Sequence, residues 1–377
     1  MRALLLSAYD APSHRYWQRG LRGMLPDWQW TCLGLPPRHF SWRVRGNPLH
    51  WALRERHTLE AGADRLIATS MVDLATLRGL VPALARIPSL LYFHENQFAY
   101  PPGRARHGLL EAQMVSLYSA LAADQLAFNS AWNRDSFLAG VTALLKRLPD
   151  YAPPEAVALL ADKSAVLPVP LLPGENAPST FCPWRGQGAV NERPLRLLWP
   201  ARLEYDKGGE GLEALLTVLL ARGLDFELAI VGQQFRQVPE VFSRIQRTLG
   251  ARLVQLGWLE AVADYQQLLA QADIVLATAL HEFQGLAVME AVERGCLPVL
   301  PRRLAYPELY PAPFLYPSHP DEPAREATGA ADRVMALASA LRRGTVQPPS
   351  VAGHSLAALA PRWRQALGAL AGGGESR

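Results

Sequence analysis

The sequence predicts an α/β protein made of two Rossmann-like domains, each built on a parallel sheet. Short apolar runs typical of buried strands alternate with helical patterns along the chain, which indicates βαβ units. At 377 residues the chain exceeds what one hydrophobic core usually organises. The alternation is interrupted over 172–194, where proline and glycine are frequent. We therefore expect domains at 1–171 and 195–350, joined by this linker.

Each element is predicted from an apolar run or from helical periodicity. In the first domain the strands are expected at 3–7, 28–33, 65–69, 89–93, 125–129 and 165–169. Its helices are expected at about 15–24, 50–62, 73–85, 107–123 and 130–146. In the second domain the strands are expected at 195–200, 226–231, 253–256, 274–277 and 298–300, with helices between them. A final helix within 351–371 precedes a glycine-rich tail, 372–377, that we expect to be disordered.

Composition excludes several classes of protein. No apolar run approaches the roughly twenty residues of a membrane-spanning helix, and the leucines at 4–6 are too few for a secretion signal. Cys32, Cys182 and Cys296 are odd in number and widely spaced, so neither a disulfide framework nor a zinc site is suggested. We expect a cytoplasmic monomer with no membrane partner.

Positive charge is concentrated near the N-terminus. Residues 1–110 hold 14 arginines against seven aspartates and glutamates, a balance of +7 in a chain whose net charge is +4. A basic first domain indicates an anionic partner, and nucleic acid is one candidate. Codon usage that favours arginine is the alternative explanation, and composition alone leaves both open.

Two cations follow the first strand of the second domain. Arg202 and Lys207 lie in the loop that opens the next helix. A guanidinium fork and an ammonium at the carboxyl end of a strand would compensate for the negative charge of a diphosphate leaving group. Two ordinary surface cations would show the same sequence pattern, so this pair indicates a phosphate site only in combination with the next motif.

The loop after 274–277 carries the strongest signal in the chain. Glu282 and Glu290 stand eight residues apart, with Gly285 between them at the start of an apolar helix. The first N–H groups of that helix would bind a phosphate anion. Glu282 would accept hydrogen bonds from sugar hydroxyls, and Glu290 from a ribose. The other donor contacts expected here are Phe283, Gln284 and Leu286.

The cation pair and the two-glutamate loop occur in this order, and each follows a strand. Together they resemble the glycosyltransferase family 4 group of retaining enzymes, over residues 195 to about 300. The resemblance implies the GT-B fold, in which two Rossmann-like domains present parallel sheets across a cleft. It also implies that the cation pair binds donor phosphates and that the two glutamates form the family's two-glutamate motif. Gly232 and Trp258 would belong to the loops around the nucleotide base.

A polar cluster follows the strand at 89–93, where the sheet edge would meet a ligand. Its four consecutive members are His94, Glu95, Asn96 and Gln97. His94 is either a structural histidine or a group that hydrogen-bonds the donor hexose and orients attack, and its place at a strand end favours the second. After the first strand the family's glycine-rich loop is missing. Ser13 would cap the following helix there, and we include Ser13 and His14 in the acceptor site.

These N-terminal residues narrow the resemblance. The runs 94–97, 128–130, 146–150, 199–200 and 281–283 together resemble the tRNA-queuosine α-mannosyltransferase family, and the similarity extends from Leu5 to about Tyr316. The resemblance implies transfer of mannose from GDP-mannose to queuosine in the anticodon loop of an aspartate tRNA. Asn129, within the second run, joins the expected acceptor site. An arginine-rich first domain fits a tRNA partner, since phosphate contacts supply much of the affinity for nucleic acid.

The stretch 38–45 interleaves cations with aromatic residues, and a second basic loop spans 104–107. Aromatic faces would stack on splayed bases while guanidinium groups meet phosphates. The expected phosphate contacts are Arg43, Arg45, Arg104 and Arg106. In the alternative, Phe40 and Trp42 are core residues and the arginines are merely solvated.

The expected mechanism needs no enzymic general base, because the leaving diphosphate itself can take the acceptor proton. Charge stabilisation and sugar orientation define the expected catalytic residues, which are His94, Arg202, Lys207 and Glu282. No Asp-X-Asp pair follows a strand, and no cluster has metal-ligand spacing, so we expect no metal or other cofactor.

Two other functions stay open. One is a GT-B glycosyltransferase that acts on a glycan or another small-molecule acceptor; a lipid acceptor is disfavoured because no basic amphipathic helix is evident. The other is a catalytically silent, tRNA-binding relative, against which the complete donor motifs argue. A nucleotide-dependent dehydrogenase is disfavoured because no G-x-G-x-x-G follows the first strand of either domain.

Overall fold

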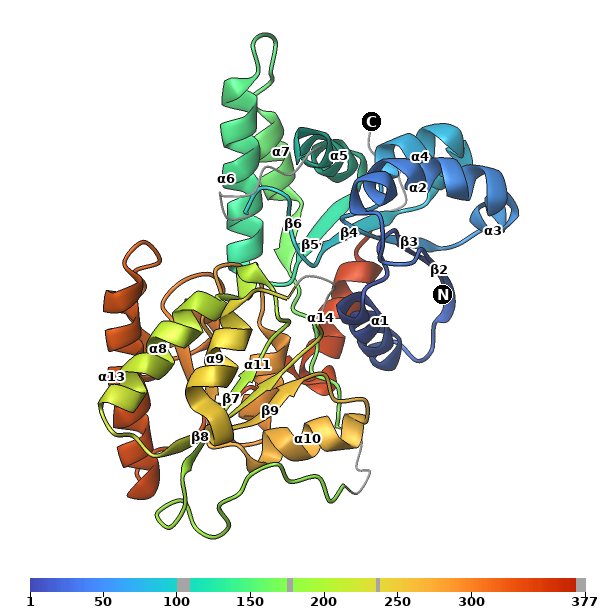
Figure 1. Cartoon of the computed structure of the whole chain (residues 1–377). Helices are drawn as coiled ribbons and strands as arrows, with labels where there is room; N and C mark the ends of the chain where they lie inside the picture. The colour runs from blue at the N-terminus through green and yellow to red at the C-terminus, as the bar shows by residue number, and fades with distance from the viewer. Residues whose placement is uncertain (100–108, 175–178, 235–237, 371–377) are drawn as a thin grey trace. The chain divides into compact units, whose positions relative to one another are not determined.

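The computed structural model describes residues 1–99, 109–174, 179–234 and 238–370, in two compact units (Figure 1). The N-terminal unit comprises Met1–Leu172 and His354–Arg377, and the C-terminal unit comprises Pro173–Gly353. Each unit is built on six parallel strands, which confirms the predicted α/β class and its two Rossmann-like sheets. Arg104, Arg106 and the tail at 372–377 lie outside the described residues. In the described part, no helix combines the length and the apolar character needed to cross a membrane.

The sheet of the N-terminal unit has the order β2-β1-β3-β4-β5-β6. Its strands are β1 (Arg2–Ser7), β2 (Gln29–Gly34), β3 (Arg65–Thr69), β4 (Ser89–Phe93), β5 (Gln125–Phe128) and β6 (Ser164–Val166). Its helices are α1 (Pro12–Met24), α2 (Phe40–Arg54), α3 (Arg56–Glu60), α4 (Leu74–Leu80), η1 (Pro82–Arg86), α5 (Leu109–Ala122), α6 (Ala131–Arg147), α7 (Ala156–Asp162) and α14 (Leu356–Gly368), and the short helix η5 (Ala352–His354) spans the boundary between the two units. All six predicted strands are present, but α7 was not predicted.

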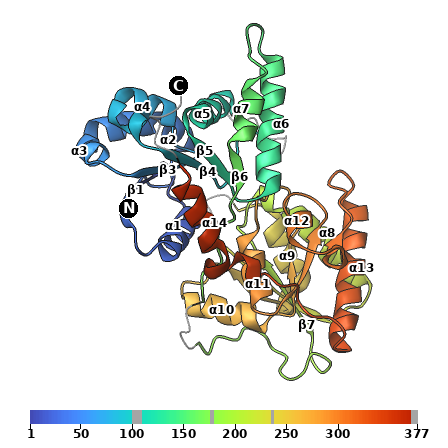
Figure 2. The same ribbon diagram turned by 180° about the vertical axis from the view of Figure 1, so that it is seen from behind.

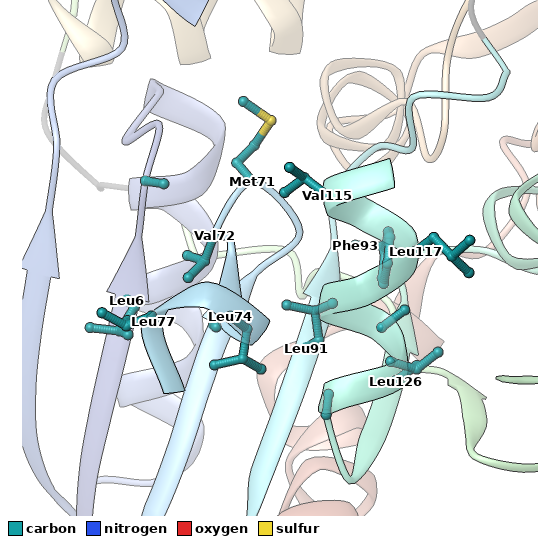
Figure 3. Close-up of a cluster of buried hydrophobic side chains, with 14 of the residues drawn as sticks. Leu6, Met71, Val72, Leu74, Leu77, Leu91, Phe93, Val115, Leu117 and Leu126 are labelled. Atoms are coloured by element: carbon teal, nitrogen blue, oxygen red, sulfur yellow. The ribbon is translucent and has the colours of Figure 1, made fainter. Parts of the chain in front are cut away.

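Helices cover both faces of this sheet. On one face, Leu91 and Phe93 of β4 pack with Leu74 of α4 and Val115 of α5 in the main core (Figure 3). On the other face, the Trp363 ring of α14 lies 5.2 Å from the Tyr92 ring, between centroids. Both views of the chain show α14 beside α1 (Figures 1 and 2). The last helix of the sequence therefore completes the hydrophobic packing of the first unit.

Helix α2 differs from the prediction of a helix at 50–62, because it begins ten residues earlier. Pro48 lies inside it and has no N–H to donate to the carbonyl of Val44. The side-chain amide of Asn47 supplies the missing donor, with Nδ2 at 3.0 Å from Val44 O and 2.8 Å from Arg43 O. This local compensation lets the helix continue through a proline.

The predicted cap of the first helix is also wrong. Helix α1 begins at Pro12, and its N-cap is Ala11, which makes no side-chain capping bond. Proline is favoured in a first turn because its missing N–H would have no helical partner there. Ser13 consequently lies inside the first turn with an exposed side chain.

The sheet of the C-terminal unit has the order β12-β11-β10-β7-β8-β9. Its strands are β7 (Leu195–Pro200), β8 (Phe226–Val231), β9 (Leu253–Gly257), β10 (Ile274–Leu276), β11 (Leu297–Pro301) and β12 (Leu315–Tyr316), the last of which was not predicted. Its helices are η2 (Tyr205–Lys207), α8 (Gly209–Ala221), α9 (Val241–Leu249), η3 (Gly250–Arg252), α10 (Val262–Gln271), α11 (Leu286–Glu293), α12 (Tyr306–Leu309), η4 (Ala312–Phe314) and α13 (Pro323–Arg342). Side chains from α8, α9 and α13 pack together in its main core.

The segment before β7 is tied to this unit. Trp184 is buried beneath the guanidinium of Arg196, and Arg193 pairs with Asp273 at 2.6 Å. The three cysteines are free; Cys32 and Cys182 are exposed, and Cys296 is buried.

Candidate functional site

The two donor motifs of the C-terminal unit meet in one ion pair. Lys207, at the end of η2, places its Nζ atom 3.1 Å from Glu282 Oε2 and donates to the carbonyl of His281 at 3.0 Å. The Lys207 side chain is only 12% exposed, so little water screens the pair. Residues 75 positions apart thus share one charged site at the carboxyl edge of the sheet.

Both members of the pair carry charge at neutral pH. Burial opposes ionisation of Glu282, but Lys207 and backbone N–H groups of Phe283 and Gly285 lower the pKa of its carboxyl to about 2. Burial likewise opposes the charge on Lys207, but the carboxylates of Glu282 and Asp206 outweigh it and raise the pKa of the ammonium. The site therefore holds a preorganised ammonium and carboxylate.

Gly285 is the N-cap of α11 and lies in the left-handed region, with a φ of 75°. A Cβ atom at this position would lie 3.1 Å from the ring of Tyr306, so both the backbone and the space favour glycine. The first helical hydrogen bond runs from Met289 N to Gly285 O. The N–H groups of the preceding turn, at Leu286 and Ala287, are therefore placed as donors at a helix N-terminus, where an anion is favoured.

A cavity of about 30 Å³ adjoins this helix start, lined by Lys207, Glu282, Gly285 and Tyr306 among others. A larger cavity of about 180 Å³ lies between the start of α8 and α13, and its lining includes neither Lys207 nor Glu282. The smaller cavity is the candidate for the donor site, because the charged groups converge there.

Asp206 connects the two predicted cations. Its carboxylate lies 3.6 Å from both the Arg202 guanidinium and the Lys207 ammonium. Arg202 is 47% exposed and also pairs with Glu204 at 2.9 Å. Asp206 was not among the residues predicted from the sequence, although its position between the two cations could have indicated this role.

The loops predicted to surround a nucleotide base lie together. Gly232 N donates to Gly257 O at 3.2 Å, and a Cβ atom on Gly232 would clash with the carbonyl of Ala201. Trp258, the next residue along the chain, is 55% exposed and so offers an aromatic surface. Glu290 of α11 accepts a hydrogen bond from the Tyr265 hydroxyl at 3.1 Å.

Phe283 and Gln284 are both buried. The Phe283 ring packs edge-on against His281, and Gln284 Nε2 lies 3.6 Å from Met289 Sδ. These contacts shape the loop that carries Glu282.

In the N-terminal unit, His94 follows β4 and stacks on His14 with 4.1 Å between ring centroids. Trp17 and Tyr92 contact the His94 ring edge-on, at 4.9 and 4.7 Å. Burial lowers the pKa of His14 to about 4, and burial together with His14 holds the pKa of His94 well below its ordinary value. Both imidazoles are therefore neutral at pH 7, and each has one donor and one acceptor nitrogen.

An asparagine network anchors the chain around His94. The fully buried Asn133 of α6 donates to Phe93 O at 2.9 Å and to Asn129 Oδ1 at 2.8 Å. Asn129 Nδ2 in turn donates to His94 O at 2.9 Å. Asn133 was not identified from the sequence.

Asn96 belongs to the same network. Its Nδ2 donates to Asn133 Oδ1 and to Ser136 Oγ, both at 2.9 Å, while its Oδ1 accepts from Phe98 N and Ala99 N. The hydrogen-bonding capacity of this buried amide is used within the unit, which gives Asn96 a positioning role.

The other members of the polar cluster are less tightly held. Gln97 Nε2 lies 3.5 Å from Glu95 Oε1, and Gln97 Oε1 is buried without a partner among the described residues. Ser70 Oγ donates to Glu95 O, which ties the end of β3 to the cluster.

In the basic stretch 38–45, the two aromatic residues at the start of α2 differ in exposure. Phe40 packs against Tyr9 and the core, whereas Trp42 is 57% exposed, so the core alternative holds only for Phe40. Arg45 is 55% exposed and lies 3.3 Å from Asp73 Oδ2, and Arg43 Nε donates to Pro36 O.

Known proteins resemble this chain over both units. Residues 2–171 match the family described as tRNA-queuosine alpha-mannosyltransferase N-terminal, and residues 194–327 match Glycosyl transferases group 1. A tRNA-queuosine alpha-mannosyltransferase of Drosophila melanogaster is 35% identical over 317 residues, which are 83% of this chain and 82% of that protein.

Solved structures share the fold at low sequence identity. Sucrose-phosphate synthase from Thermosynechococcus elongatus has a TM-score of 0.63 and 14% identity, over 97% of this chain and 98% of that one. The lipopolysaccharide outer core galactosyltransferase WaaB has a TM-score of 0.59 and 12% identity, over 97% and 99%. The chain has the GT-B fold of glycosyltransferases, and it belongs to the tRNA-queuosine alpha-mannosyltransferase family.

Proposed function

We propose that this protein is a retaining glycosyltransferase that transfers mannose from GDP-mannose to queuosine in the anticodon loop of an aspartate tRNA in the cytoplasm. The identity to the Drosophila relative along most of both chains supports the mannosyl transfer and the tRNA acceptor. The observation that carries the proposal is the Lys207–Glu282 ion pair beside the N-terminus of α11.

The donor half of the proposal follows from the charges of the C-terminal unit. Lys207, Arg202 and the first N–H groups of α11 compensate for the charge that develops on the leaving diphosphate. Glu282 holds Lys207 in place and accepts hydrogen bonds from the hexose, and Glu290 accepts them from the ribose. We propose that this fixed positive charge makes a metal ion unnecessary.

The acceptor half of the proposal concerns the new glycosidic bond between the acceptor oxygen and the anomeric carbon of mannose. An acceptor hydroxyl attacks the anomeric carbon on the face from which the diphosphate leaves, so the configuration is retained. A departing phosphate oxygen takes the hydroxyl proton, and neutral His94 orients the hexose by a hydrogen bond. The exposed arginines of the N-terminal unit bind tRNA phosphates.

A direct assay tests this function. The protein is incubated with GDP-mannose and tRNA that contains queuosine, and the released nucleosides are weighed by mass spectrometry. We expect the mass of queuosine to rise by one hexose, and tRNA that lacks queuosine to stay unchanged. Unmodified queuosine after prolonged incubation would reject the acceptor.

The nucleotide specificity gives a separate prediction. GDP should raise the melting temperature by an amount that grows with the logarithm of its concentration above the Kd, since a ligand present at 100 times its Kd stabilises the folded state by about 2.7 kcal/mol. UDP should raise it much less. Glu290→Ala, which removes the expected ribose contact, should abolish the shift. Equal shifts with GDP and UDP in thermal melts would contradict the guanine assignment.

A further inference from the structure

One side of α2 presents an unusual exposed stripe. Trp42, Arg45, Leu49 and Leu53 follow each other at helical spacing and so share one side of the helix. Their side chains are exposed, at 57% for Trp42, 52% for Leu49 and 71% for Leu53. The opposite side of α2, with Trp51, is buried in the core. The stripe is therefore a surface of the unit.

Gly46 explains how the tryptophan is held on this surface. Glycine inside a helix costs about 0.5–1 kcal/mol relative to alanine, and Gly46 has no positive φ that would require it. A Cβ atom there would lie 2.5 Å from Cε2 of the Trp42 ring. The indole thus lies against the helix backbone in the space that the missing Cβ provides. Because more than half of the side chain stays exposed, its outer surface is accessible.

The charge around the indole favours an anionic partner. Residues 28–54 contain four arginines and no aspartate or glutamate. The carboxylate that pairs with Arg45 belongs to Asp73, which is 3% exposed, so the cation and not the acid faces solvent. An accessible aromatic surface beside guanidinium groups is the arrangement that binds unpaired bases and their phosphates.

We propose that Trp42, seated on Gly46, is a stacking platform for an unpaired base of an RNA acceptor, with Arg45 at a neighbouring phosphate. This inference rests on the proposed tRNA acceptor and names the surface that holds it. Stacking of a base on an aromatic side chain contributes about 1–3 kcal/mol. The platform therefore contributes a large part of the binding free energy for tRNA, and it makes no contact with the donor.

Three variants separate stacking from folding. Trp42→Ala should weaken tRNA binding by about tenfold or more, as measured by filter binding, and Trp42→Phe should have a smaller effect. Gly46→Ala keeps the tryptophan and raises helix propensity, so its melting temperature should be no lower than that of the wild type. It should nevertheless weaken tRNA binding, because the new methyl group displaces the indole. The thermal shift with GDP should be unchanged in all three.

Leu159→Ala is the matched control, because Leu159 is a 58% exposed apolar residue on α7, outside the stripe. It should bind tRNA as the wild type does. Wild-type affinity in both Trp42→Ala and Gly46→Ala would overturn the platform. So would a loss of self-association in these variants with tRNA affinity unchanged, since the stripe would then join two copies of the chain. Because binding is measured without transfer, a wild type that binds tRNA but transfers no mannose would contradict the proposed activity and leave the platform standing.

Discussion

Replacing Lys207 by alanine is expected to lower turnover by about a hundredfold or more, the scale of losing one preorganised electrostatic group. The ammonium is 12% exposed and is held by Glu282 and by the carbonyl of His281. Its removal takes positive charge from the proposed diphosphate site and leaves the Glu282 carboxylate without its cationic partner. The measurement is the kcat for mannose transfer at saturating GDP-mannose and tRNA.

Lys163→Ala provides the control for this variant. Lys163 donates to the carbonyls of Leu121 and Ala123, so its loss also removes two hydrogen bonds, but in the N-terminal unit. We expect a lower melting temperature and a nearly normal kcat. If Lys207→Ala, with intact folding by circular dichroism, turned over within threefold of the wild type, the phosphate site would lie elsewhere.

Strands were predicted well because their signal is local. The strands β3, β4, β7 and β8 have the predicted bounds, since each is a short apolar run with clear limits. Helix α2 was placed wrongly because its continuation past Pro48 depends on what the Asn47 side chain does, which propensity does not describe. The packing of α14 on the N-terminal unit is a tertiary contact across nearly the whole chain.

In the candidate sites, too, the features that depend on local sequence were predictable, and those that depend on side-chain contacts were not. The donor motifs each follow a strand of one parallel sheet, so the convergence of Lys207 and Glu282 could be predicted from order alone. The polar run after β4 was harder to interpret, because a polar side chain can serve a ligand or its own backbone. Asn96 serves the backbone of its loop and α6, whereas the Nε2 atom of His94 is buried without a hydrogen-bond partner among the described residues. Sequence spacing also could not decide that Phe40 faces the core and Trp42 faces solvent.

Asn133→Ala is expected to have the largest effect on stability among these substitutions. The change leaves Asn129 Oδ1 without the donor that Asn133 supplies, and it removes one of the two donors to Phe93 O, which still accepts from Asn129 N. A buried group left unsatisfied costs about 1–3 kcal/mol. We therefore expect the free energy of unfolding to fall by about 2 kcal/mol in urea titrations. The kcat should also fall, because Asn129, which donates to His94 O, loses its contact with Asn133. The thermal shift with GDP should persist, since that site lies in the other unit. Asn191→Ala, at an exposed asparagine of the C-terminal unit, is the control and should change neither quantity. A variant of Asn133 as stable and as active as the wild type would show that the network does not position His94.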